Sequence, residues 1–169
     1  MIYHDSVPHY SQFQDIPRVE WRAEGCGIAS IAMAVEFYKP NSVSITDLIL
    51  QALKLGAHAP GVGWKHKELS ALAGLYGLDG KNYDLTDMTK LTAFDEFKKI
   101  LADGPVIASI HNKFDPRATL GHLVVVTGMD NGMIFYHDPA YRDKIAKMIS
   151  EKNFLKGWKQ RLITVREKA

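Results

Sequence analysis

The sequence predicts an α+β fold in which helices of the first half pack on an antiparallel β-sheet formed by the last third. Helical periodicity dominates as far as Asp103, and β-rich runs follow it. Asp130-Asn131-Gly132, between two of these runs, is a hairpin turn signal. With 169 residues, no repeat and no long linker, we expect a single domain over residues 1–169.

Residues 27–38 are expected to form a buried helix. Its apolar residues surround the helix almost completely, which is typical of a helix packed on all sides. Lys39-Pro40-Asn41 ends it. The 25 residues before it are predicted to be irregular.

Three further helices are expected over residues 44–55, 65–76 and 94–103. Ser44-Ile45-Thr46-Asp47 is a capping box, Gly77 is a C-terminal stop, and Thr92 is the expected cap of the last helix. The strands are expected over residues 105–111, 122–129, 133–138 and 160–165, with a short helix over 150–157.

Composition excludes several classes of function. Lys plus Arg number 21 against 19 Asp plus Glu, a net charge of +2 without any basic block, so nucleic acid is not an expected partner. No run approaches 18 apolar residues, so no membrane span is expected. The N-terminus MIYHDSVPHYSQ lacks the features of a signal peptide, which favours a cytoplasmic location.

Cys26 is the only cysteine, so the chain cannot form an internal disulfide. It stands at the start of the buried helix, where unpaired N–H groups and the helix dipole favour a thiolate. Gly25 and Gly27 beside it allow another backbone to approach the sulfur. A nucleophile and a small buried apolar residue are both consistent with this position.

A nucleophilic cysteine needs a base and a group that orients the base. His122 opens an otherwise apolar strand, and Asp138 ends the next one. An exposed histidine at a strand end is the alternative reading of His122. No two of the seven histidines have the spacing of a metal site, and we expect neither a metal nor a cofactor.

The hairpin register decides whether His122 and Asp138 can meet. With a two-residue loop the two side chains point to opposite faces of the sheet. With a three-residue loop, residues 130–132, His122 lies opposite Ala140, and Asp138 is a diagonal neighbour on the same face. A Cys at a helix start with a His–Asp pair on a hairpin is the papain-type arrangement.

Two tryptophans and a glycine-rich stretch are further candidates near the site. Trp21 and Trp64 are expected in the core, with the walls of a substrate cleft as the alternative. Residues 61–63, Gly-Val-Gly, form either a rim of the cleft or a plain connection.

Several segments, in this order, resemble the stand-alone relatives of the double-glycine peptidases, the thirty-ninth family of cysteine peptidases, which have a papain-like fold. The segments are VPHYSQ, EGCGIASIAMAVEFY, GWKHKELSALAGLYGL, LADGPVIASIH, GHLVVVTGMDNG and HDPA. The resemblance runs from Val7 to Val165. It implies that a buried helix carrying the cysteine packs on a sheet carrying the histidine and the aspartate.

The resemblance implies a role for each candidate. Cys26 would be the nucleophile, His122 the base and Asp138 the residue that orients the ring. The family completes its oxyanion hole with a glutamine. The position used by transporter-linked members is Glu20 here, so Gln12 is the matching candidate, with Gln14 in reserve.

Two classes of function follow from this set of residues. The first is a thiol hydrolase that cleaves a peptide or small amide substrate through an acyl-enzyme, or an acyl transferase using the same residues. The second is a papain-like binding module with little or no turnover. A redox sensor, which would not need His122 or Asp138, is a third possibility.

Overall fold

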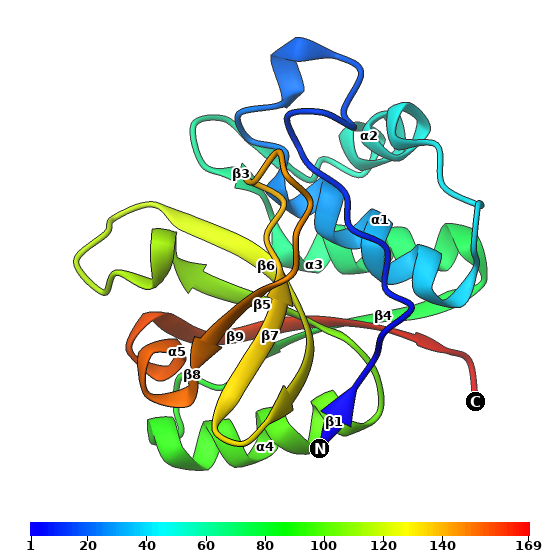
Figure 1. The fold of residues 1–169 in the computed structure, drawn as a ribbon. Helices are drawn as coiled ribbons and strands as arrows, with labels where there is room; N and C mark the ends of the chain where they lie inside the picture. Colours follow the sequence, from blue (N-terminus) through cyan, green and yellow to red (C-terminus); the bar gives the residue numbers. More distant parts are fainter.

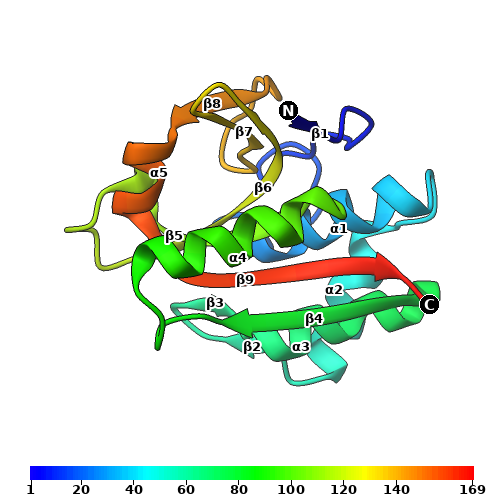
Figure 2. The ribbon, with the colours of Figure 1, turned by 90° about the horizontal axis from the view of Figure 1, so that it is seen from below.

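In the computed structural model, all 169 residues are described, and helices cover both faces of a seven-stranded antiparallel sheet (Figures 1 and 2). The α-helices are α1 (Cys26–Tyr38), α2 (Ile45–Lys54), α3 (His66–Ala71), α4 (Lys90–Ala102) and α5 (Glu151–Gly157). The strands are β1 (Ile2–Tyr3), β2 (His58–Ala59), β3 (Gly63–Trp64), β4 (Leu78–Asp84), β5 (Val106–His111), β6 (Gly121–Asp130), β7 (Met133–His137), β8 (Lys147–Ser150) and β9 (Trp158–Glu167). No helix is long and apolar enough to cross a membrane.

The predicted α+β class is confirmed. The main sheet has the order β4-β9-β5-β6-β7-β8, with β1 paired to β6, and every pairing in it is antiparallel. β2 and β3 form a separate small hairpin near the start of α1. The buried helix over 27–38 is confirmed as α1. Ser44 is confirmed as the N-cap of α2, because its side chain accepts a hydrogen bond from Asp47 N.

The sheet separates two hydrophobic cores. Leu123 and Val125 of β6 belong to the core under α1, α2 and α3, whereas Val124 and Val126 belong to the core under α4 and α5. Figure 1 shows α4 on the side of the sheet opposite α1. Because successive residues of a strand face opposite sides, burial of both faces explains why β6 is apolar without alternation.

Several elements differ from their predicted bounds. The helix expected over 94–103 begins at Lys90, because Thr89 and not Thr92 is the cap; its side chain accepts from Thr92 N. The helix expected over 65–76 ends at Ala71 and continues as a 3₁₀ turn to Gly77, which has a φ of 72°. β4 was not predicted, because an edge strand with an exposed face is rich in polar residues.

The hairpin between β6 and β7 has a two-residue loop, the alternative expected to place His122 and Asp138 on opposite faces of the sheet. Asp130 pairs with Met133 across Asn131-Gly132. The register then shifts by one residue, because β6 carries Thr127 as a β-bulge between Val126 and Gly128. Beyond the bulge the register is that of a three-residue loop, and His122 and Asp138 lie on the same face.

The bulge is covered by the N-terminal strand. The carbonyl of Thr127 accepts a hydrogen bond from His4 N (2.8 Å), and Tyr3 pairs with Gly128. A Cβ on Gly128 would lie 2.4 Å from the carbonyl oxygen of Ile2. Glycine at this position is therefore what allows β1 to approach the bulge.

Edge strand β4 packs against the end of α3 through a glycine. A Cβ on Gly80 would lie 1.7 Å from the carbonyl oxygen of Ser70, a backbone atom that cannot move away cheaply. We predict that Gly80→Ala lowers the free energy of unfolding by about 2–3 kcal/mol, measured by urea denaturation. Gly74→Ala is the matched control, since nothing lies within 4 Å of its Cβ. Equal stability of the two variants would contradict this packing.

Candidate functional site

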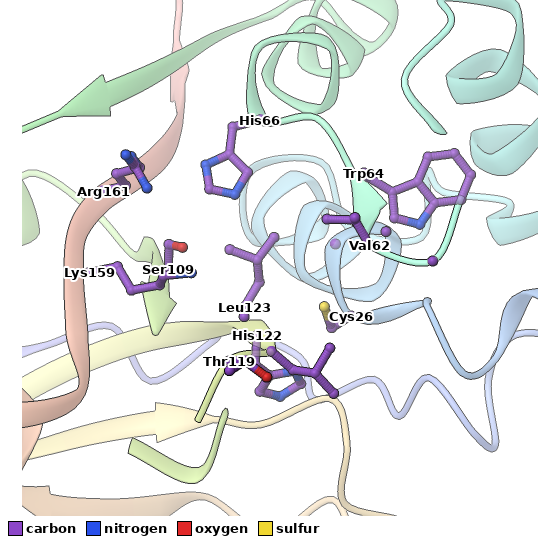
Figure 3. A pocket seen from close by; sticks show the side chains of 15 residues that line it. Cys26, Val62, Trp64, His66, Ser109, Thr119, His122, Leu123, Lys159 and Arg161 are labelled. Carbon is purple, nitrogen blue, oxygen red and sulfur yellow. The ribbon is translucent and has the colours of Figure 1, made fainter. Parts of the chain in front are cut away.

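Cys26 is the first residue of α1, and the helix places its side chain at the mouth of a cleft (Figure 3). The first hydrogen bond of the helix runs from the Ala29 N–H to the Gly25 carbonyl (3.0 Å). The Cys26 N–H lies in the first turn and therefore has no acceptor inside the helix. A Cβ on Gly25 would lie 2.3 Å from Ile16 Cδ1, and one on Gly27 would lie 2.8 Å from Leu69 Cδ1. The two glycines therefore let the start of α1 pack tightly behind the thiol.

The structure brings His122 and Asp138 into direct contact. His122 Nε2 donates to Asp138 Oδ1 at 2.6 Å, and the same oxygen accepts from Ala140 N at 2.9 Å. Both side chains are almost fully buried. Asp138 occupies Nε2 and leaves the other ring nitrogen, Nδ1, unused. Figure 3 shows Cys26 and His122 at the same end of the cleft.

The environment of His122 favours a charged ring. Burial alone lowers the pKa of His122, but hydrogen bonds to Asp138 and Cys26 and the charges of both raise the pKa to about 10. A group whose charged form is stabilised this way is an imidazolium at neutral pH. Such a cation beside a thiol stabilises the thiolate.

A strap of N-terminal residues packs behind Asp138. His9 and His137 stack with their ring centroids 4.4 Å apart; His9 Nε2 donates to the Asp138 carbonyl (3.2 Å) and His137 Nε2 to that of Val7 (3.1 Å). Burial, followed by the charge of His9, lowers the pKa of His137 to about 4. The His137 ring is therefore neutral near neutral pH. The hydrogen bonds of the two stacked rings fix the backbone on which Asp138 stands.

Gln12 is buried next to the segment that leads to Cys26. Its Nε2 donates to the carbonyls of Arg22 (2.8 Å) and Ala23 (3.4 Å), and its Oε1 is buried without a partner. Its backbone N–H bonds to the carbonyl of Pro139. Gln12 therefore connects the cysteine segment with the aspartate segment, whereas the reserve candidate Gln14 is exposed.

Glu24, which sequence analysis missed, fixes one rim of the cleft. Its carboxylate accepts from His58 Nε2 (2.7 Å) and from Gly61 N (2.9 Å), and its carbonyl accepts from Trp64 Nε1 (2.9 Å). These contacts tie the β2–β3 hairpin to a residue two positions before Cys26. Residues 61–63 are therefore a rim of the cleft. Trp64 is buried as expected, and it also lines the cleft.

The cleft has a volume of about 270 Å³ and extends away from Cys26 and His122 to Lys159, Arg161 and His66 (Figure 3). Leu123 lies between its two ends in the figure. Sequence analysis did not predict this basic end, because β9 and α3 are far from Cys26 in the chain. Only their packing shows that they share one cavity.

Comparisons with known proteins agree with this architecture. A family model described as Peptidase_C39 like family matches residues 4–162. No curated protein matches significantly.

Among solved structures, a C39-like peptidase from Bacillus anthracis is 18% identical with a TM-score of 0.65, over 99% of this chain and 98% of that one. A double glycine motif protease of an AMS/PCAT transporter, solved with its leader peptide, is 21% identical with a TM-score of 0.60, over 85% and 84%. The peptidase domain of Streptococcus ComA is 19% identical with a TM-score of 0.64, over 86% and 93%. These likenesses establish the papain-like fold.

We predict that the ring of His122 titrates near pH 10, and that Asp138→Asn or Cys26→Ser lowers this pKa, because each puts a neutral group in place of one whose negative charge raises the pKa. The ring nitrogen shifts in ¹⁵N NMR measure it. Since the pKa in the fold exceeds the ordinary value of 6.5, the stabilisation is complete below pH 6.5 and is lost as the pH rises through about 10. Asp130→Asn, at the hairpin turn, is the control. An unchanged pKa in Asp138→Asn would contradict the assignment.

Removal of the Glu24 carboxylate should loosen the rim. In Glu24→Ala the Gly61 amide loses its acceptor, so we expect its hydrogen exchange to accelerate by about tenfold or more, as measured by NMR. Glu68→Ala, which removes a carboxylate from the first turn of α3, serves as the matched control and should leave Gly61 unchanged. Exchange at the wild-type rate in Glu24→Ala would show that other contacts hold the hairpin.

Proposed function

Because the chain belongs to the Peptidase_C39 like family, we propose that it is a thiol hydrolase that cleaves a peptide bond through an acyl-enzyme on Cys26. The observation that carries the proposal is the contact of His122 with Asp138 at 2.6 Å, beside a cysteine at the start of a buried helix. Nucleophile, base and orienting group are the parts that this chemistry requires.

In the first step the Cys26 thiolate attacks the scissile carbonyl carbon, and a C–S bond forms. The imidazolium of His122 then gives its proton to the leaving amine as the C–N bond breaks. Asp138 accepts from Nε2 throughout, so it holds the ring in one orientation and leaves Nδ1 for proton exchange with Cys26 and the leaving amine. An acyl-enzyme and a free amine result.

In the second step His122, now neutral, takes a proton from water, and the resulting hydroxide attacks the thioester carbonyl. The C–S bond breaks, the carboxylic product leaves, and the proton on His122 restores the ion pair with the thiolate. Every proton passes through His122, which is why its buried position between Cys26 and Asp138 matters for turnover.

Oxyanion stabilisation would come from the N–H of Cys26 and from Gln12. The Cys26 N–H has no partner within the helix, and helix N-termini favour negative charge. Gln12 Nε2 holds the Arg22 carbonyl firmly at 2.8 Å, whereas its 3.4 Å contact with Ala23 is weak. The N–H of that weak contact is the one that would turn to the oxyanion.

A peptide is the substrate class that we propose. The double glycine motif protease among the structural neighbours was solved with a leader peptide, and the rim of the cleft here is formed by Gly61 and Gly63 around exposed Val62. A peptide-binding module with little turnover is the second candidate. The engaged amide of Gln12 favours it, because an oxyanion hole needs a free donor.

Thiol reactivity separates the two candidates. Since Cys26 is the only cysteine, alkylation by iodoacetamide, followed by intact mass, reports this residue alone. At pH 6 we expect wild-type protein to react about tenfold or more faster than a simple thiol of pKa about 8.5, and His122→Ala to remove most of the excess. His111→Ala, whose ring bonds to the Ala118 carbonyl, is the control.

A wild-type rate no higher than that of a simple thiol would reject the hydrolase and leave the binding module. In the opposite case, turnover of an internally quenched peptide with Gly-Gly before the scissile bond is the next measurement. Cys26→Ala should abolish that turnover, whereas Asp138→Asn should retain part of it, because Asp138 orients the base without reacting.

A further inference from the structure

The end of the cleft away from Cys26 is basic. Lys159, Arg161 and His66 line it together with the hydroxyl of Ser109, and no Asp or Glu side chain lines the cleft anywhere. The chain as a whole has a net charge of only +2. The concentration of positive charge is therefore a local feature of this cavity.

A second β-bulge forms the basic end. Ser109 of β5 pairs with Arg161, but the next residue, Ile110, pairs with Trp158, so Lys159 and Gln160 are extra residues on β9. Gln160 has a φ of 57°, an unfavourable backbone conformation for a residue other than glycine. Bulges of this kind change the direction of side chains and are frequent beside active sites.

The second bulge is held in place by a neighbouring loop. Gln160 Nε2 donates to the carbonyls of Leu85 (3.0 Å) and Met88 (2.9 Å), and the carbonyl of Gln160 accepts from Leu85 N (2.8 Å). Three hydrogen bonds thus support the strained residue between Lys159 and Arg161. The two cations are presented by a fixed piece of backbone.

The charges at this end are largely free to bind a ligand. Lys159 forms no ion pair, and Arg161 makes only a long contact of 3.4 Å with exposed Asp84. Burial, followed by the charges of Arg161 and Lys159, lowers the pKa of His66, so its ring is a neutral donor near neutral pH. The Lys159 ammonium group lies close to Gly121, the residue before His122: a Cβ added to Gly121 would be 3.2 Å from Lys159 Nζ.

We propose that Lys159 and Arg161, with His66 and Ser109, form a subsite that binds a carboxylate of the substrate while its scissile bond lies at Cys26. The inference rests on the proposed function, because it takes the cleft at Cys26 to be the substrate cleft. Cations and neutral donors in a cleft that no Asp or Glu lines are the groups that hold a carboxylate by charge-assisted hydrogen bonds. The carboxylate belongs either to an acidic side chain or to a chain terminus.

The test measures binding without turnover, using Cys26→Ala protein and NMR titration. The ligands are N-acetylated, C-amidated Ala-Ala-Ala-Gly-Gly peptides in which Glu or Gln replaces each alanine in turn. At one position we expect Glu to bind about 5–10-fold more tightly than Gln. The unsubstituted peptide with a free C-terminal carboxylate tests the other source. Preference for it over its amide would assign the subsite to a terminal carboxylate.

Variants assign the preference to its residues. Adding Lys159→Met or Arg161→Gln should reduce the Glu-to-Gln ratio to less than about 2, because each removes a charged donor. Lys159→Arg should keep the Glu-to-Gln ratio, because it retains the positive charge. Lys67→Met is the matched control, since Lys67 is exposed on α3 and does not line the cleft.

Two results would overturn the subsite. In the first, no Glu peptide binds more tightly than its Gln counterpart, and the free carboxylate binds no more tightly than the amide. In the second, the preference for the carboxylate survives the combined substitution Lys159→Met and Arg161→Gln. Iodoacetamide alkylation of the protein with Cys26 intact is measured in parallel. A reactive thiol without carboxylate preference rejects the subsite alone. If the thiol is unreactive but the peptides still show the carboxylate preference, the hydrolase proposal is rejected and the carboxylate-binding cleft is retained.

Discussion

The extra residue in β6, Thr127, is the constraint on which the site depends. Side chains alternate along a strand, so a shift of one residue exchanges the two faces of the sheet. The two-residue turn at Asn131-Gly132 would by itself place His122 and Asp138 on opposite faces, and the bulge reverses that outcome. β1 covers the bulge, which makes the N-terminal segment part of the structure that positions the site.

A rigid surrounding keeps the three groups in place. α1 is buried on nearly all sides, and Cys26 extends from its first turn, where the backbone is held by close contacts at Gly25 and Gly27. His122 stands on β6, which has a hydrophobic core on both faces, and Asp138 directly follows the last residue of β7. Groups held on packed helices and strands keep their geometry better than groups on loops.

The two bulges of the sheet affect different parts of the cleft. The bulge of β6 sets the relation of His122 to Asp138. The bulge of β9 presents Lys159 and Arg161 at the opposite end, with the intervening Gln160 held by three hydrogen bonds. A regular sheet would form the same core, but it would neither pair His122 with Asp138 nor present Lys159 and Arg161 together. The functional geometry therefore depends on the irregular residues.

The sequence by itself determined the fold class, the buried helix that begins at Cys26 and the three residues His122, Asp138 and Cys26 as a possible set, because periodicity and helix-start chemistry are local properties. It did not determine the bulges, Glu24 or the basic end of the cleft. Those depend on which strands become neighbours, and that is decided by burial of the two cores. Residues distant in the chain share a cavity only once the sheet has formed.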